Sequence, residues 1–335
     1  MSMTGKLTAA IIGGGVIGGG WAARFLLQGH DVVLFDQDPD CESKIRVVLD
    51  NARQALPDLY DTELPQEGSF RVAASLADAV SAADWIQESV PERLDVKHAV
   101  FREIDEHAPA SALLGSSTSG FKPSELQAGS ARPDRLFVAH PFNPVYLLPL
   151  VEIVGGEAAD AAVLDRASTI LDSLGMKPLR VKREIDAHIA DRFLEAVWRE
   201  ALWLVKDGVA TTSDIDDAIR YGFGLRWAQM GLFETYRIAG GQGGMAHFLE
   251  QFGPCLKWPW TKLMDVPDLD DELVNTIADQ SDAQSGEHSI TELEQMRDRN
   301  LVGIMRALKQ TDWGAGSLLN AHETRLRTDD AQQRD

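Results

Sequence analysis

The chain has 335 residues, of which 44% are hydrophobic and 25% charged, a length and composition that suit about two globular domains. Its formal net charge of -20 argues against nucleic acid and anionic membranes as partners. No apolar run approaches the ~20 residues of a membrane span, and the N-terminal residues do not resemble a signal peptide. Since the only cysteines are Cys41 and Cys255, we expect no disulfide framework and a cytoplasmic location.

The first predicted elements form a dinucleotide-binding unit. An apolar strand, Leu7–Ile12, leads into a glycine-rich turn and then a helix that ends near Gly29. Gly13, Gly15 and Gly18 fit the pattern G-x-G-x-x-G, in which the glycines allow a tight turn, a close approach of backbone to a pyrophosphate, and close helix–strand packing. The residues expected to bind the cofactor at this helix N-terminus are Gly13, Gly14, Gly15, Val16, Ile17 and Gly18.

An acidic residue follows the second predicted strand. The predicted strand Asp31–Phe35 is followed directly by Asp36, which lies 18 residues beyond Gly18. A carboxylate at this point can accept hydrogen bonds from both ribose hydroxyls and repels a 2′-phosphate. The sequence therefore predicts NAD, rather than NADP, as the cofactor.

Strand-like and helical segments continue to alternate, as in an open and largely parallel sheet. The further runs are Phe70–Ala73, Trp85–Val90, Ala112–Ser116, Leu136–Ala139, Leu150–Val154 and Leu179–Val181. We therefore predict an α/β fold with an N-terminal Rossmann-type, doubly wound domain. Ligands of such sheets lie beyond the carboxyl ends of the strands, so residues 88–92, residues 115–119 and His140 are expected to line one crevice.

One histidine in that crevice has the character of a general base. His140 ends an apolar strand, and Glu152 lies within the next one. An imidazole can take a proton from a bound hydroxyl near neutral pH, and a neighbouring carboxylate fixes its tautomer and stabilises its charged form. The pair is therefore a candidate catalytic dyad. No metal site is expected.

The second half of the chain has helical periodicity. We predict an NAD-binding domain over residues 1–184, an all-α domain over 185–322 that contains a long helix from Ile185 to Val205, and a loose polar tail over 323–335. Between Asp186 and Trp260 lie half of the aromatic residues of the chain. Most of these are expected to form helical core, and a few can bind an organic cation through their ring faces.

The chain resembles the 3-hydroxyacyl-CoA dehydrogenase superfamily over nearly its full length. The resemblance is carried by the glycine turn and by three long segments, His140–Val154, Thr211–Tyr236 and Phe252–Asp265. Within the superfamily it looks most like the branch that oxidises the 3-hydroxyl of carnitine, a quaternary ammonium hydroxy acid, with NAD. The resemblance implies a small-molecule substrate and a homodimer formed through the helical domain.

Roles within the superfamily carry over to matching positions. The resemblance implies that His140 and Glu152 form the base pair and that Ser119 hydrogen-bonds the reacting oxygen. It places Glu92 and Lys97 near the nicotinamide end of the cofactor. One position departs from the pattern, because Asp191 stands where the acyl-CoA enzymes carry asparagine. An anionic side chain cannot donate to an oxyanion, so Asp191 either faces a quaternary ammonium or pairs with a nearby arginine.

The substrate stays open among three kinds of hydroxy acid. Residues 37–67 carry eight acidic and three basic side chains, which disfavours binding of the phosphates of CoA. L-Gulonate, a sugar acid, calls for several polar side chains, whereas a trimethylammonium group calls for apolar and aromatic walls. The aromatic residues expected to favour a trimethylammonium are Phe142, Tyr146, Phe233, Tyr236 and Phe252. A remote alternative is a non-catalytic NAD-binding protein, as in lens relatives of this fold.

Overall fold

The computed structural model describes residues 5–228, 231–239, 242, 244–254, 261, 270–273, 275–276, 279–280 and 287–334. They belong to two compact units. The first contains the residues up to Ile189 together with those from Gln295 onward, and the second contains Ala190–Glu294. Most of the segment Phe252–Asp265, which carried part of the family resemblance, lies outside the described residues.

The first unit is built on an eight-stranded sheet with the strand order β3-β2-β1-β4-β5-β6-β7-β8. Neighbouring strands are parallel, except that β6 and β7 are antiparallel. The strands are β1 (Thr8–Ile12), β2 (Asp31–Phe35), β3 (Phe70–Val72), β4 (Trp85–Glu88), β5 (Leu113–Ser116), β6 (Leu136–Pro141), β7 (Leu150–Val154) and β8 (Lys177–Val181). Each overlaps a predicted run, and the Rossmann-type, largely parallel sheet is confirmed.

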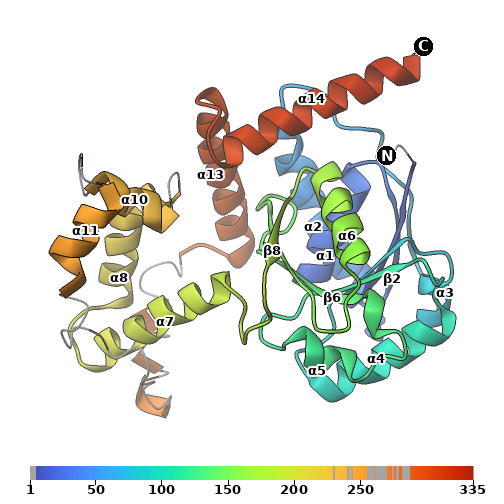
Figure 1. The fold of residues 1–335 in the computed structure, drawn as a ribbon, viewed down its shortest axis with the longest axis horizontal. Helices are drawn as coiled ribbons and strands as arrows, with labels where there is room; N and C mark the ends of the chain where they lie inside the picture. Colours follow the sequence, from blue (N-terminus) through green and yellow to red (C-terminus); the bar gives the residue numbers. More distant parts are fainter. Residues whose placement is uncertain are drawn as a thin grey trace. The chain divides into compact units, whose positions relative to one another are not determined.

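Two hydrophobic clusters cover the two faces of this sheet. Alternate residues of β1 point to opposite faces, so Ile11 joins one cluster and Ile12 the other. The first cluster packs under α1 (Val16–Leu27), α2 (Cys41–Ala55) and α6 (Ala161–Ser173), and the second under α3 (Leu76–Val80), α4 (Leu94–His107) and α5 (Pro123–Gln127). Figure 1 shows these helices on either side of the sheet. Single helical turns also occur at η1 (Pro57–Leu59) and η2 (Pro133–Arg135).

The C-terminal residues differ from the expected loose tail. Helix α13 (Ile290–Gln310) is followed by α14 (Ala315–Arg334), which runs through the predicted tail boundary at residue 323. Leu319, His322 and Leu326 share one face of α14, and their exposed fractions are 2%, 1% and 9%. The Nε2 atom of His322 lies 2.9 Å from Oε1 of Gln28 on the first unit. The tail was predicted to be loose because its composition is polar and its apolar residues are few. The buried face of α14 instead packs on the first unit, and the last 41 residues belong to that unit rather than to the helical domain.

The second unit is helical, as expected for the C-terminal domain. Its described elements are α7 (Ala190–Lys206), α8 (Thr212–Ala218), the π-helical turn η3 (Ile219–Phe223), α9 (Gly224–Trp227), α10 (Gly231–Ala239) and α11 (Gly244–Phe252). The first helix begins at Ala190 and not at Ile185, because Ala187 and His188 adopt left-handed backbone conformations with φ of 59° and 51°. Within the described residues, no helix is both long and apolar enough to cross a membrane.

Candidate active site

The glycine turn between β1 and α1 has the steric properties of a nucleotide cradle. A Cβ atom on Gly13 would lie 2.5 Å from the carbonyl oxygen of Ser89, and one on Gly18 would lie 1.9 Å from the carbonyl oxygen of Gly13. A Cβ on Gly15 would meet no atom within 4 Å. The first and third glycines are therefore required by packing inside the protein, whereas the second faces open space that a ligand can occupy.

The surroundings of the turn fit NAD. Helix α1 has no side-chain cap and no acidic residue in its first turn, so its N-terminal N–H groups can receive an anion such as pyrophosphate. Asp36 follows β2, and its two carboxylate oxygens accept hydrogen bonds from the backbone N–H groups of Gly14, at 2.5 Å, and Asp38, at 2.8 Å. These bonds fix the carboxylate beside the glycine turn, where the sequence placed it for the ribose hydroxyls.

His140 and Glu152 form a buried pair on adjacent strands. The antiparallel register of β6 and β7 places them directly opposite each other, and Nδ1 of His140 lies 3.0 Å from Oε2 of Glu152. His140 is 4% exposed and Glu152 is fully buried. Since an ionised carboxylate can only accept, Nδ1 carries the proton of this hydrogen bond, and Nε2 is the ring nitrogen that does not face Glu152. The predicted pairing of the two residues is present in the structure.

The chain segment after β8 holds the other oxygen of the carboxylate. The backbone N–H of Ile189 donates to Oε1 of Glu152 at 2.9 Å. The imidazole ring of His140 lies against two further rings, with centroid distances of 5.0 Å to Phe142 and 5.4 Å to His188. Sequence reasoning found Phe142 but did not find His188 or Ile189.

A second buried ionic group lies at the ends of β4 and β5. The ammonium of Lys97 lies 2.8 Å from Oε1 of Glu88, 3.1 Å from Oε2 of Glu92 and 3.4 Å from the carbonyl oxygen of Val90. These acceptors match its three donors, so Lys97, at 1% exposed, supports Glu92 and has no donor left for direct contact with a cofactor. Glu88, which also accepts from Ser116 at 2.5 Å, lies in the segment expected to line the crevice, but the sequence suggested no role for it.

The pKa values of the two carboxyl groups, Glu88 and Glu92, are shifted in opposite directions. Burial raises the pKa of Glu88 above its ordinary value, and the adjacent Lys97 only partly offsets that effect. For Glu92, burial also acts to raise the pKa, but the hydroxyl of Thr118 and the ammonium of Lys97 together hold it below its ordinary value. Glu92 is therefore ionised at neutral pH.

Ser119 lies in the loop that follows β5, and its side chain is exposed. We call residues 117–120 the serine loop. Glu92 binds this loop on both sides of Ser119, because its Oε1 accepts hydrogen bonds from the hydroxyl of Thr118 and from the backbone N–H of Gly120, the latter at 3.2 Å. The serine therefore lies at the carboxyl edge of the sheet, on a loop held by Glu92, whose carboxylate pairs with the buried ammonium of Lys97.

The predicted substrate residues are divided between the two units. Phe142 is half-buried beside His140. Tyr146 is 3% exposed in the hydrophobic core, where its hydroxyl donates to Oδ2 of Asp298 at 2.5 Å, so it does not form part of a substrate wall. Asp191, Phe233, Tyr236 and Phe252 belong to the second unit. Phe233 is 69% exposed, and Tyr236 is stacked on Phe248 at 4.6 Å.

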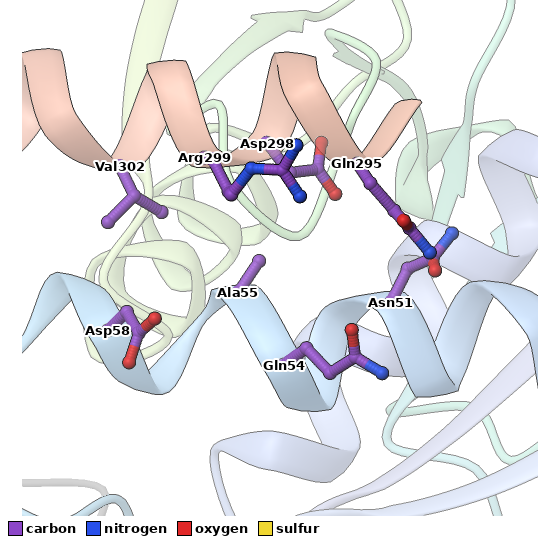
Figure 2. A pocket seen from close by; sticks show the side chains of 8 residues that line it. All are labelled: Asn51, Gln54, Ala55, Asp58, Gln295, Asp298, Arg299 and Val302. Carbon is purple, nitrogen blue, oxygen red and sulfur yellow. The ribbon is translucent and has the colours of Figure 1, made fainter. Parts of the chain in front are cut away.

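A separate pocket lies between α2 and α13 of the first unit (Figure 2). It is lined by Asn51, Gln54, Ala55, Asp58, Gln295, Asp298, Arg299 and Val302, and has a volume of about 310 Å³. None of these residues was predicted to take part in catalysis or cofactor binding. Among the residues described, no cluster of three or more histidine, cysteine, aspartate or glutamate side chains has an arrangement that suits a metal ion.

Comparison with known protein families gives matches over both units. Residues 8–185 match the NAD binding domain of 3-hydroxyacyl-CoA dehydrogenase, and residues 188–270 match the C-terminal domain of the same enzyme. Among solved structures, a similar one is that of 5-formyl-3-hydroxy-2-methylpyridine 4-carboxylic acid 5-dehydrogenase, an NAD+ dependent dismutase. It has 30% sequence identity and a TM-score of 0.77, and the match covers 91% of this chain and 99% of that one.

Two curated relatives are considerably more similar in sequence. The L-carnitine dehydrogenase/betainyl-CoA thioesterase of Ruegeria pomeroyi is 66% identical over 96% of this chain and 66% of its own length. The L-carnitine dehydrogenase of Mesorhizobium japonicum is 58% identical over 95% of this chain and 88% of its own length. The chain thus spans about two thirds of the first relative, whose name combines two activities.

Proposed function

This chain belongs to the 3-hydroxyacyl-CoA dehydrogenase family, and on that basis we propose that it oxidises the 3-hydroxyl of L-carnitine to 3-dehydrocarnitine with NAD. The observation that carries the proposal is the buried His140–Glu152 pair at the carboxyl end of β6, a general base in a chain 58% identical to a protein named L-carnitine dehydrogenase. The sequence from the glycine turn to Asp36 supports NAD as the cofactor.

The cofactor would be held by the first two βα units. The turn from Gly13 to Gly18 and the N-terminus of α1 would receive the pyrophosphate, and Asp36 would accept from the adenosine ribose and repel a 2′-phosphate. Glu92 would lie toward the nicotinamide end, supported by Lys97. When bound, NAD supplies the acceptor for the hydride that leaves the substrate carbon.

His140 acts as the general base of the proposed reaction. With Nδ1–H donated to Glu152, its Nε2 takes the proton of the 3-hydroxyl as the carbon–hydrogen bond breaks. Glu152 is held by Ile189 N–H and stabilises the imidazolium that results. A positioned base contributes about 10²–10⁴-fold to the rate, so orientation of the substrate must supply much of the remainder.

Ser119 orients the reacting oxygen in this proposal. Its hydroxyl is exposed on the serine loop, which Glu92 holds by the two residues on either side. A hydroxyl can donate to the substrate oxygen and still leave the proton of that oxygen free to pass to His140. Ser119 and His140 would thus act on the same atom of the substrate.

Aromatic side chains favour a trimethylammonium substrate. Phe142 packs on the base itself, and Tyr236, Phe248 and Phe252 form a ring cluster in the second unit with successive centroid distances of 4.6 and 4.9 Å. Ring faces of this kind attract an organic cation, which a sugar acid or an acyl-CoA does not carry. Phe233 and Asp191 of the same unit remain candidates for contact with the ammonium group.

We also propose that the protein is a cytoplasmic homodimer that associates through its helical unit. The described part of that unit exposes several large apolar side chains on α7, among them Phe193 at 55%, Leu194 at 56% and Trp198 at 58%. Few residues of the unit are buried, so its helices lack a sufficient core of their own within the described residues. Docking a second copy would cover this surface.

The experiment that tests the activity follows NADH absorbance at 340 nm with L-carnitine, D-carnitine, L-gulonate and 3-hydroxybutyryl-CoA, each with NAD and with NADP. We expect turnover of L-carnitine with NAD, and rates at least tenfold lower for the other combinations. Preference for gulonate or the CoA ester would overturn the substrate assignment and retain the dyad. NADH binding without turnover of any hydroxy acid would support a non-catalytic dinucleotide-binding protein.

A further inference from the structure

Three consecutive residues between β8 and α7 make hydrogen bonds to both the serine loop and Glu152, the two parts of the proposed catalytic site. The backbone N–H of Ala187 donates to the carbonyl oxygen of Gly120 at 3.3 Å, Nε2 of His188 lies 3.2 Å from the carbonyl oxygen of Thr118, and Ile189 N–H donates to Glu152 at 2.9 Å. The left-handed backbone at Ala187 and His188 turns these donors toward the serine loop and strand β7. We call residues 187–189 the linker turn.

His188 is the side chain at the centre of this turn. It is fully buried, and its ring lies 5.4 Å from that of His140 at an angle of 49°. Because a carbonyl oxygen can only accept, the Nε2 atom that faces Thr118 carries a proton. The bond fixes the tautomer of His188 and anchors the serine loop to the segment that also anchors Glu152.

Ser119 lies between the two residues that the linker turn holds. Thr118 and Gly120 are bound through their carbonyl oxygens by the linker turn, and through a hydroxyl and an N–H by Glu92. Ser119 itself is exposed. The position of its hydroxyl relative to His140 therefore depends on bonds made by its neighbours.

We propose that His188 is a positioning residue, whose Nε2–H bond to the Thr118 carbonyl sets the distance between the Ser119 hydroxyl and the His140 base. This inference rests on the proposed hydroxyl oxidation. His188 touches neither substrate nor cofactor in this role. Its loss should therefore lower kcat and leave the binding of NAD and substrate nearly unchanged.

The test compares variants that separate the hydrogen bond from the ring. His188→Phe keeps an aromatic ring and loses the donor, His188→Met loses the donor with a flexible side chain, and His188→Gln keeps a donor near the position of Nε2. His98→Phe is a matched control, because Nε2 of His98 lies 2.7 Å from the carbonyl oxygen of Glu125, away from the dyad. The readouts are kcat and KM with L-carnitine, NADH binding by fluorescence, and hydrogen–deuterium exchange of residues 117–121 without ligands.

We expect His188→Phe and His188→Met to lower kcat tenfold or more, with KM and the Kd for NADH within about twofold of the wild type. Amide exchange in residues 117–121 should accelerate in both, while His188→Gln and His98→Phe stay close to the wild type. Unchanged kcat and exchange in His188→Phe or His188→Met would overturn the proposal, as would an equal loss in His188→Gln. Lack of carnitine turnover by the wild type would instead contradict the proposed function, and the exchange measurement would still decide the anchoring role.

Discussion

Replacing Glu152 by glutamine removes the charge that stabilises the imidazolium of His140. The two groups are 3.0 Å apart, with side chains 5% and 0% exposed, so screening by water is weak. With an effective dielectric constant of about 20, two unit charges at that separation interact by about 5 kcal/mol. Glutamine also has one acceptor oxygen for the two donors that Glu152 satisfies, His140 Nδ1–H and Ile189 N–H.

Since the amide dipole retains part of this interaction, we expect kcat to fall by about 10²–10³-fold. Each tenfold fall corresponds to about 1.36 kcal/mol of activation free energy. The assay is NADH production from L-carnitine at saturating NAD, beside NADH binding by fluorescence and thermal unfolding. The exposed Glu157, on the loop that follows β7, provides the control variant Glu157→Gln. A kcat for Glu152→Gln within tenfold of the wild type, in a folded protein that binds NADH normally, would refute the reasoning about the dyad.

Three other changes test the cofactor site, the ionic group and the core. Asp36→Asn should raise the KM for NAD about tenfold and allow measurable use of NADP, because repulsion of the 2′-phosphate is lost. The measurement is steady-state kinetics with both cofactors, with Asp38→Asn as the control variant. Continued exclusion of NADP by Asp36→Asn would contradict the role of the carboxylate. Glu92→Gln should lower the free energy of unfolding by about 1 kcal/mol at pH 7, a figure reduced for the 45% exposure of the carboxylate. The pKa of Glu92 in the folded protein lies below its ordinary value of 4.5, so the stability difference between wild type and variant should be present above about pH 4.5 and disappear as the pH falls further. Urea unfolding at pH 7 and at pH 4 measures this difference. Equal differences at the two pH values would contradict the prediction. Tyr146→Phe should cost about 2 kcal/mol of stability by leaving Oδ2 of the buried Asp298 without its hydroxyl donor, while Arg297 still donates to Oδ1. It should leave the KM for carnitine unchanged; a large rise in KM would restore Tyr146 to the substrate site.

The sequence was sufficient for features that depend on local pattern. Short apolar runs that alternate with helical stretches located the eight strands, and the G-x-G-x-x-G turn followed by Asp36 located the cofactor cradle. The pairing of His140 with Glu152 was also predictable, because two short strands joined by a turn bring residues of this separation into register.

Features that depend on distant contacts were not predictable from local pattern. Lys97 looks like a cofactor ligand in the sequence, yet three acceptors from β4 and its following loop occupy its donors. His188 gives no local signal, because its partner Thr118 lies 70 residues away. Tyr146 follows the catalytic motif directly, but its hydroxyl is held by Asp298, which lies 152 residues further along the chain. For His188 and Tyr146 a contact with a residue far along the chain decides which way the side chain points, whereas the partners of Lys97 lie within nine residues of it.

The most direct test of the proposed activity traces the hydride itself. L-Carnitine that carries deuterium at C3 is incubated with NAD and the protein, and the mass of the reduced cofactor is measured. We expect the deuterium to be transferred, so that the cofactor gains one mass unit more than it does with unlabelled carnitine, and we expect His140→Asn to slow the transfer at least a hundredfold. Unlabelled NADH from the deuterated substrate, or transfer at an undiminished rate by His140→Asn, would contradict it.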